Sequence, residues 1–160
     1  MNIYWAGLLA GFLATLPMTV FMILLFRRLP RKEQYPLPPR QIAMDLAEKA
    51  GVKPRLEETE RTGLTLLSHF AYGTVMGALY SLLVGKVPGP SLLKGMAFGL
   101  LVWAGSYLVL LPALGILRSA AHHPLRRNAL MIAAHIVWGV FLGLIVQALT
   151  KPTTNTGIDP

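Results

Sequence analysis

The sequence predicts an all-α membrane protein with four transmembrane helices, and three observations lead to this fold class. First, 54% of the 160 residues are hydrophobic and 14% are charged, with a mean hydropathy of +0.53, which is more apolar than a typical soluble domain. Second, four long runs contain no Asp, Glu, Lys or Arg: residues 3–26, 64–85, 95–117 and 129–150. Third, basic residues are distributed unequally between these runs. A soluble helical core is disfavoured, because each run can cross a hydrocarbon layer about 30 Å thick.

The first run, residues 3–26, is expected to be a transmembrane helix rather than a cleaved signal. No basic segment precedes it, and arginines follow it at once. Pro17 removes one hydrogen bond inside this helix and predicts a kink.

Residues 27–63 form the largest polar connection, and a short amphipathic helix is expected within it at about residues 39–50. Proline favours the start of this helix and Gly51 its end. The apolar side chains fall on one face, which is predicted to turn toward lipid or the bundle: Ile42, Ala43, Leu46, Ala47 and Ala50. Such a helix lies at the membrane interface. Packing on the mouth of the bundle and docking of a partner are both open.

The basic residues predict the orientation in the membrane. Nine Lys or Arg lie between Arg27 and Arg61, and three more lie in or beside the third connection, against three near the other ends of the spans. Because basic residues stay on the cytoplasmic side, both termini are predicted to face outward in a multi-pass inner-membrane protein. The net charge of +8 therefore needs no nucleic-acid partner, and membrane lipids are the expected surroundings.

A phrase occurs twice, as HFAYGTVMG at residues 69–77 and as HIVWGVFLG at residues 135–143. Both fit His-x-x-aromatic-Gly-x-x-x-Gly at an offset of 66 residues. With two spans in each half, the sequence predicts two tandem two-helix repeats related by an axis along the membrane normal.

Glycines four residues apart occur in all four spans and are predicted to let helix backbones approach closely. The predicted packing residues are Gly7, Gly11, Gly73, Gly77, Gly95, Gly99, Gly139 and Gly143. They are expected to pack within one chain, although one pair could support a homo-oligomer.

Several phrases together resemble the YagU-type family of small bacterial inner-membrane proteins. They are PLPPR at residues 36–40, HFAYGTVMGALY at 69–80, LPALGI at 111–116 and the His-x-x-Trp of residues 135–138. The resemblance implies a four-helix inner-membrane fold of uncharacterised activity, and it carries no catalytic residues over to this chain.

The candidate ligand-binding residues are His69, His135, Gly73 and Gly139, because a spacing of four places each histidine on the face of its following glycines. Three interpretations are open. Each imidazole could hydrogen-bond a neighbouring helix, at Ser68, at Thr15 or at a backbone carbonyl freed by Pro17, in a purely structural role. The pair could instead ligate haem b or a chlorin, or line a path for protons or a solute. A metal site is not expected, since only two ligands converge.

No catalytic set of residues, phosphate-binding loop or HExxH motif is present. The sequence therefore predicts a non-enzymatic polytopic membrane protein without a cofactor, acting alone or as an accessory subunit beside other membrane subunits. A haem- or pigment-binding subunit and a small transporter are the alternatives.

Overall fold

A computed structural model describes residues 1–85 and 87–151, and within these residues all regular structure is helical. The elements are α1 (Ile3–Phe26), η1 (Arg31–Glu33), α2 (Pro38–Lys49), η2 (Lys53–Arg55), α3 (Glu58–Leu83), α4 (Ser91–Ala104), η3 (Gly105–Leu110), α5 (Leu111–Ala113), η4 (Ala120–His122) and α6 (Leu125–Thr150). Four helices are long and apolar enough to cross a membrane: α1, α3, the continuous segment Ser91–Ala113 and α6. The predicted all-α fold with four membrane-spanning helices is confirmed.

The helix boundaries depend on local signals that hydropathy does not contain. α1 has the bounds expected from its apolar run. α3 begins six residues before its apolar run, because Glu57 and Glu60 form a reciprocal capping box that starts the helix among charged residues. The third span ends at Ala113 instead of residue 117. There the N–H of Gly115 (φ +64°) donates to the carbonyl of Pro112, and the N–H of Ile116 donates to that of Leu111, a Schellman ending.

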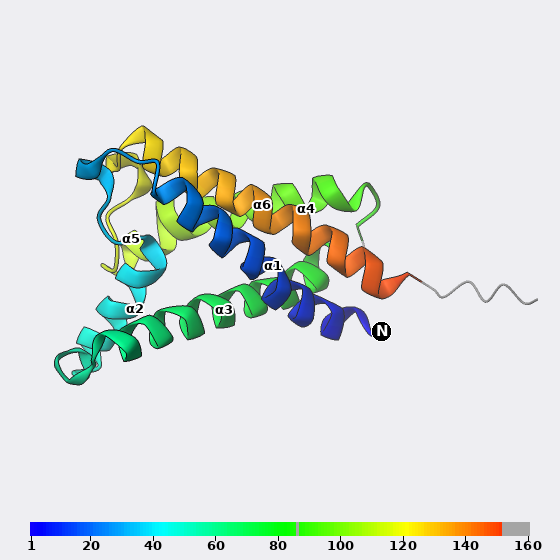
Figure 1. Cartoon of the computed structure of the whole chain (residues 1–160). Helices are drawn as coiled ribbons and strands as arrows, with labels where there is room; N and C mark the ends of the chain where they lie inside the picture. Colours follow the sequence, from blue (N-terminus) through cyan, green and yellow to red (C-terminus); the bar gives the residue numbers. More distant parts are fainter. Residues whose placement is uncertain (86, 152–160) are drawn as a thin grey trace, which may run out of the picture.

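The four spans form two pairs, α1 with α3 and α4 with α6, joined where α1 packs against α6 (Figure 1). α3 and α4 hardly touch. The N-terminus, the turn between α3 and α4 and the end of α6 lie at one end of the bundle, whereas α2 and η4 lie at the other (Figure 1). Two parts of the predicted topology lie outside the described residues: Lys86 and residues 152–160, which are predicted to face outward.

Glycines face one another within both pairs. A Cβ added to Gly77 would collide with the backbones of Gly7 and Gly11, and a Cβ added to Gly139 would collide with the carbonyl of Gly95. The two pairs differ by one helical turn. Gly7 faces Gly77, the second glycine of its repeated phrase, whereas Gly95 faces Gly139, the first glycine of the other copy.

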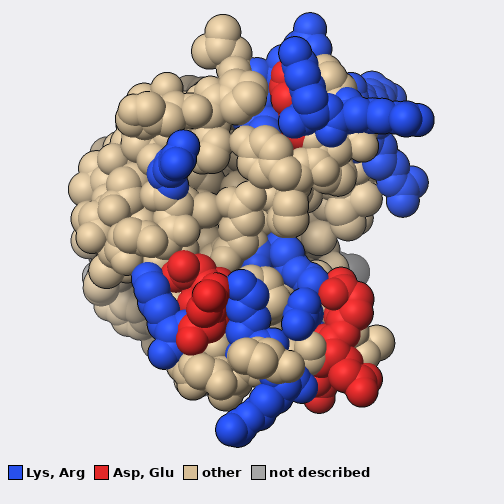
Figure 2. Space-filling model, turned by 90° about the vertical axis from the view of Figure 1, so that its left-hand side faces the viewer, with Lys and Arg blue, Asp and Glu red and all other residues tan. Residues whose placement is uncertain are grey.

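α2 packs across α3 at the end of the bundle that carries most of the charge, shown face on in Figure 2. Arg40 pairs with Glu58 at 2.8 Å, and Lys49 donates to the carbonyl of Leu114 at 3.1 Å. The predicted apolar face of α2 is divided between two environments. Ala43 and Ala47 are buried, at 1% and 3% exposed, whereas Leu46 is 47% exposed and lines a cavity at this end of the bundle.

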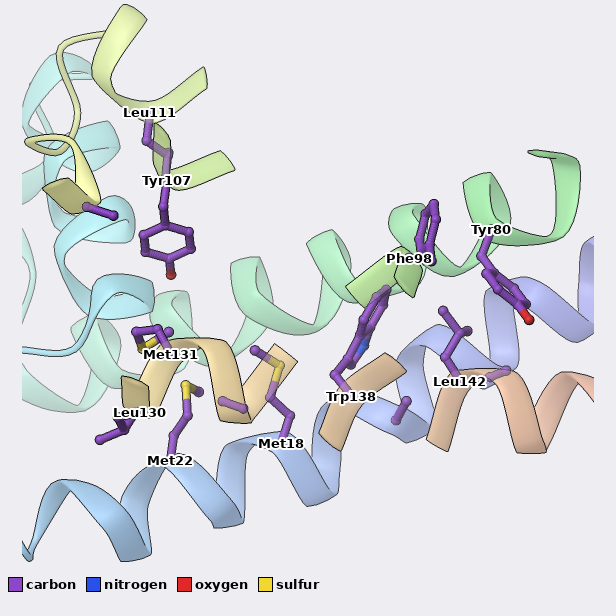
Figure 3. Packing of buried hydrophobic residues seen from close by; sticks show 14 of the residues in the cluster. Met18, Met22, Tyr80, Phe98, Tyr107, Leu111, Leu130, Met131, Trp138 and Leu142 are labelled. Carbon is purple, nitrogen blue, oxygen red and sulfur yellow. The ribbon is translucent and has the colours of Figure 1, made fainter. Parts of the chain in front are cut away.

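The core runs along α1, α4 and α6. At the end near the α3–α4 turn it is filled by Tyr80, Phe98 and Leu142, and toward α2 by methionines of α1 and α6 (Figure 3). Trp138 lies between these two parts, and its Nε1–H donates to the carbonyl of Gly11 at 3.4 Å. The buried core therefore extends on both sides of Trp138, with aromatic residues toward the α3–α4 turn and methionines toward α2.

Candidate functional site

A cavity of about 200 Å³ lies between the two helix pairs, on the side of the bundle where α3 and α4 separate. Residues of α1, α3, α6, the α4–α5 segment and α2 line it. At the charged end, Pro39, Ile42 and Leu46 of α2 cover it. At the other end Trp138 closes it, supported by the ring of Phe98 at a centroid distance of 6.2 Å. The cavity therefore extends from beneath α2 into the interior of the bundle.

His135 lines this cavity from α6 and is 5% exposed. Its Nδ1 lies 2.8 Å from the carbonyl oxygen of Met131, one turn earlier in the same helix. A carbonyl can only accept, so in the neutral ring Nδ1 carries the hydrogen and Nε2 carries a free lone pair. The ring also meets Tyr107 edge to face, with centroids 5.7 Å apart. The ring is thus fixed in one tautomer and one orientation.

His69 lines the same cavity from α3 and is half-buried. Its Nε2 is buried and has no hydrogen-bond partner within the part of the chain that the structure describes. The structure therefore brings both repeated histidines to one internal site, although their hydrogen bonding differs.

The expected partners on neighbouring helices are not used. The hydroxyl of Thr15 donates to the carbonyl of Gly11 at 2.8 Å, and that of Ser68 donates to the carbonyl of Thr65 at 3.1 Å. Helical Ser and Thr side chains commonly bond to their own preceding turn, and this uses the single hydrogen of each hydroxyl. The expectation that each imidazole bonds a neighbouring helix is wrong for His135, which bonds its own helix.

The predicted glycines divide between two environments. Gly73 lines the cavity, and a Cβ there would meet the hydroxyl of Thr15. Gly139 does not line it, because the one-turn shift of the second pair places this glycine against Gly95. Three of the four predicted ligand-binding residues thus share the cavity, and Gly139 belongs to the contact between α4 and α6.

A π-helical segment, η3, supplies polar groups that the sequence did not single out. It interrupts the third span over Gly105–Leu110 and includes the buried residues Ser106 and Tyr107, both of which line the cavity. The hydroxyls of Ser106 and Tyr72 are 2.8 Å apart and bridge η3 to α3. Such π segments often occur at functional sites. The local signals were the pair Gly105-Ser106 and Pro112, which lacks the N–H that would bond to Leu108.

Three methionines from three different helices also line the cavity: Met18 of α1, Met76 of α3 and Met131 of α6. Figure 3 shows Met131 below Tyr107 and close to Met22, with Met18 on the side toward Trp138. Methionine is a common filler of irregular core space, and the spacing of these residues in the sequence does not indicate that they meet.

Arg127, in the first turn of α6, fixes the polar connection next to this site. Its guanidinium is buried and donates to the carbonyls of Glu33, Tyr35 and Pro36 at 2.8, 2.9 and 3.1 Å. It also lies over the ring of Tyr35, 3.5 Å from the ring centroid, in a cation–π arrangement. One arginine of the second helix pair thus anchors the segment that leads into α2 (Pro38–Lys49).

Comparison with known protein families matches residues 29–144 to the family described as a protein of unknown function, DUF1440. No curated protein and no solved structure shows significant similarity to the chain. The matched residues include the polar connection, η3 and both cavity histidines. An uncharacterised family was expected from the motifs; the YagU-type name and the bacterial origin stay predictions. Because the match covers more than half of the sequence, the chain belongs to the DUF1440 family.

Proposed function

We propose that the protein is a non-enzymatic multi-pass membrane protein that binds a small ligand in the cavity between its two helix pairs. The observation that carries this proposal is the buried Nε2 of His69, which has no partner among the described residues and belongs to a residue that lines the same cavity as His135. Leaving a buried polar atom unpaired costs about 1–3 kcal/mol. A ligand that bonds this nitrogen would offset that cost.

The volume limits the size of the ligand. At about 200 Å³ the cavity is larger than the roughly 150 Å³ cavity that admits benzene and smaller than the roughly 300–1,000 Å³ pockets of drug-sized ligands. Haem b or a chlorin is our second candidate, because two imidazoles line one cavity. It ranks second because a macrocycle is larger than the cavity, so that α3 and η3 would have to separate further.

Binding is better supported than transport or a proton path. Trp138 and the aromatic residues behind it close the inner end of the cavity, and the described lining contains no carboxylate, which proton relays in membranes usually include. We also favour binding over catalysis, because the hydroxyls of Thr15 and Ser68 are bonded to their own helices rather than to a histidine.

The location and orientation are part of the same proposal. We place the protein in a bacterial inner membrane with α2 on the cytoplasmic side, because basic residues are concentrated at that end. Its lipid-facing helices leave room for a second copy or for other subunits, so an accessory role in a larger membrane assembly is compatible with ligand binding.

Site-directed labelling tests the orientation. Single cysteines are introduced at Thr59, in the first turn of α3, and at Val87, in the turn between α3 and α4; both residues are exposed. The chain has no cysteine of its own, so an impermeant thiol reagent should label Thr59→Cys only from the cytoplasmic side and Val87→Cys only from the outside. Labelling of both from one side would contradict the topology.

Native mass spectrometry of the gently purified protein tests ligand binding. We expect a retained small ligand in the unmodified protein and its loss in Val102→Trp, since Val102 lines the cavity and the larger ring fills it. Val75→Trp is the matched control, because Val75 is 58% exposed on the outer face of α3. Equal retention in both variants, or no ligand in the unmodified protein, would contradict the proposal. A visible Soret band would favour the macrocycle.

A further inference from the structure

We propose that the ligand is a monovalent copper ion, Cu(I), held by the imidazoles of His69 and His135 and by two thioethers, that of Met131 and that of Met18 or Met76. This inference rests on the proposed function, because it names the ligand of the same cavity. The five side chains come from α1, α3 and α6, and all of them line that cavity.

Both histidines line the cavity and carry nitrogen donors. The Nδ1–H of His135 is used by the carbonyl of Met131 at 2.8 Å, so the Nε2 lone pair is free. Metal-bound histidines usually donate their other N–H to a carbonyl or carboxylate in this way, which fixes the ring and raises the basicity of the ligand. His69 adds a second Nε2 that is buried without a partner among the described residues.

The methionines select the kind of metal. Thioether sulfur is a soft ligand that favours Cu(I), whereas Mg²⁺ and Ca²⁺ require oxygen ligands. Within residues 1–85 and 87–151 no group of three or more His, Cys, Asp or Glu could hold an ion, so a structural zinc set is not available there. Without the methionines, only the two histidines could serve as metal ligands in this cavity.

The charge of the ion agrees with the surroundings. All five side chains are neutral as ligands, so the complex keeps the charge of the metal. Charge inside the membrane is expensive, and the cost of desolvating an ion rises steeply with its charge. A monovalent ion is therefore favoured over a divalent one in this cavity.

The side chains can close on an ion that is smaller than the cavity. Methionine has three rotatable bonds and adapts to irregular space, so two sulfur atoms can move inward while His135 stays fixed by its hydrogen bond. Ile42 and Leu46 of α2 cover the cavity at the charged end, which is the side from which an ion would enter.

Competition for Cu(I) tests this assignment. The full-length protein in detergent is titrated with Cu(I), kept reduced by ascorbate, against the chromogenic chelator bicinchoninate. We expect about one ion for each chain, and a loss of affinity of about tenfold or more in His135→Phe, His69→Phe and Met131→Leu, since even outer-shell changes weaken metal sites by about 10–100-fold. Leucine keeps the volume of methionine, so folding should be preserved.

Met96→Leu is the matched control, because Met96 lies in α4 away from the cavity lining and should leave the affinity unchanged. X-ray absorption of the loaded protein should show both nitrogen and sulfur neighbours of copper. Failure to compete with bicinchoninate, or an equal effect of Met96→Leu and Met131→Leu, would overturn the copper assignment. If native mass spectrometry still shows a molecule that Val102→Trp loses, the proposed function stands without copper; if neither ligand is found, both proposals fail.

Discussion

The two helix pairs carry the same repeated phrase, yet the phrase serves different surroundings in each. In the α1–α3 pair, His69 is half-buried, its Nε2 has no partner among residues 1–85 and 87–151, and Gly73 lines the cavity. In the α4–α6 pair, His135 is buried and bonded to its own helix, and Gly139 is closed by the backbone of Gly95.

A difference of one helical turn in the contacts accounts for much of this contrast. Moving the glycine contact by one turn brings Gly99 against the carbonyl of His135, so α4 covers the backbone at this histidine. No such glycine lies against His69 in the first pair, where Gly11 faces Gly73. A repeated motif thus supplies similar helix faces, while the register of its partner helix decides which face becomes a packed contact and which becomes a cavity wall.

Substituting the first glycine of each phrase with alanine should give the largest difference in stability between the two helix pairs. In Gly139→Ala the new Cβ meets the backbone carbonyl of Gly95, which cannot move without separating α4 from α6. In Gly73→Ala it first meets the side-chain hydroxyl of Thr15, which can turn away if its hydrogen bond to Gly11 breaks. We expect a loss of about 3 kcal/mol in the free energy of unfolding for Gly139→Ala and about 1 kcal/mol for Gly73→Ala.

Denaturation of each variant in mixed micelles, followed by circular dichroism, measures these losses. Gly63→Ala in α3 is the control, because nothing lies within 4 Å of its added Cβ and alanine favours a helix over glycine. Equal losses at positions 73 and 139 would show that the one-turn shift does not determine the packing.

Arg127→Gln should weaken the contact between the two helix pairs, because this arginine of α6 holds the connection that follows α1. The substitution removes a buried guanidinium that donates to three carbonyls of residues 33–36, and we expect a loss of about 2 kcal/mol. Trypsin should then cleave faster at Arg31 and Lys32. Arg126→Gln is the matched control, since Arg126 is exposed; equal cleavage of the two variants would remove the anchoring role.

The fold could be predicted from the sequence because each span is an uncharged run that hydropathy detects directly. α1 agrees to the residue, since Arg27 ends both the apolar run and the helix. The start of α3 could not be predicted from hydropathy, because its first turn is charged and depends on the capping box of Glu57 and Glu60. Hydropathy also does not show which apolar residues of α2 are buried most deeply; they are Ala43 and Ala47 rather than Leu46.

The site could be predicted only in part. The spacing of the repeated phrase and the expense of polar groups in lipid placed both histidines in the interior, and the structure places them on one cavity. The other lining groups come from Met18, η3 and α2, which lie far apart in sequence and meet only through tertiary packing. Arg127 was assigned to the cytoplasmic charge, because sequence does not show whether an arginine faces water or backbone carbonyls.

Replacing each histidine with phenylalanine gives the smallest effects and the sharpest comparison of the two pairs. Phenylalanine keeps a ring of similar size, so the change removes the nitrogens with little loss of packing. His135→Phe loses the hydrogen bond to Met131 and should lower the free energy of unfolding by about 1 kcal/mol. His69→Phe loses no bond of its Nε2 and removes a buried unpaired nitrogen, so the ligand-free protein should be equally or slightly more stable.

In the variants His69→Phe and His135→Phe, the change in ligand binding should not be proportional to the change in stability. Both substitutions remove a donor from the cavity, so both should weaken retention of the ligand, although only one destabilises the fold. A stability gain combined with a binding loss in His69→Phe is the signature of a residue kept for function at a cost in stability. Thermal unfolding of the ligand-free proteins, set beside ligand retention for the same samples, measures both quantities. If His69→Phe destabilises the ligand-free protein as much as His135→Phe while leaving ligand retention unchanged, His69 serves packing, and the two copies of the phrase are equivalent after all.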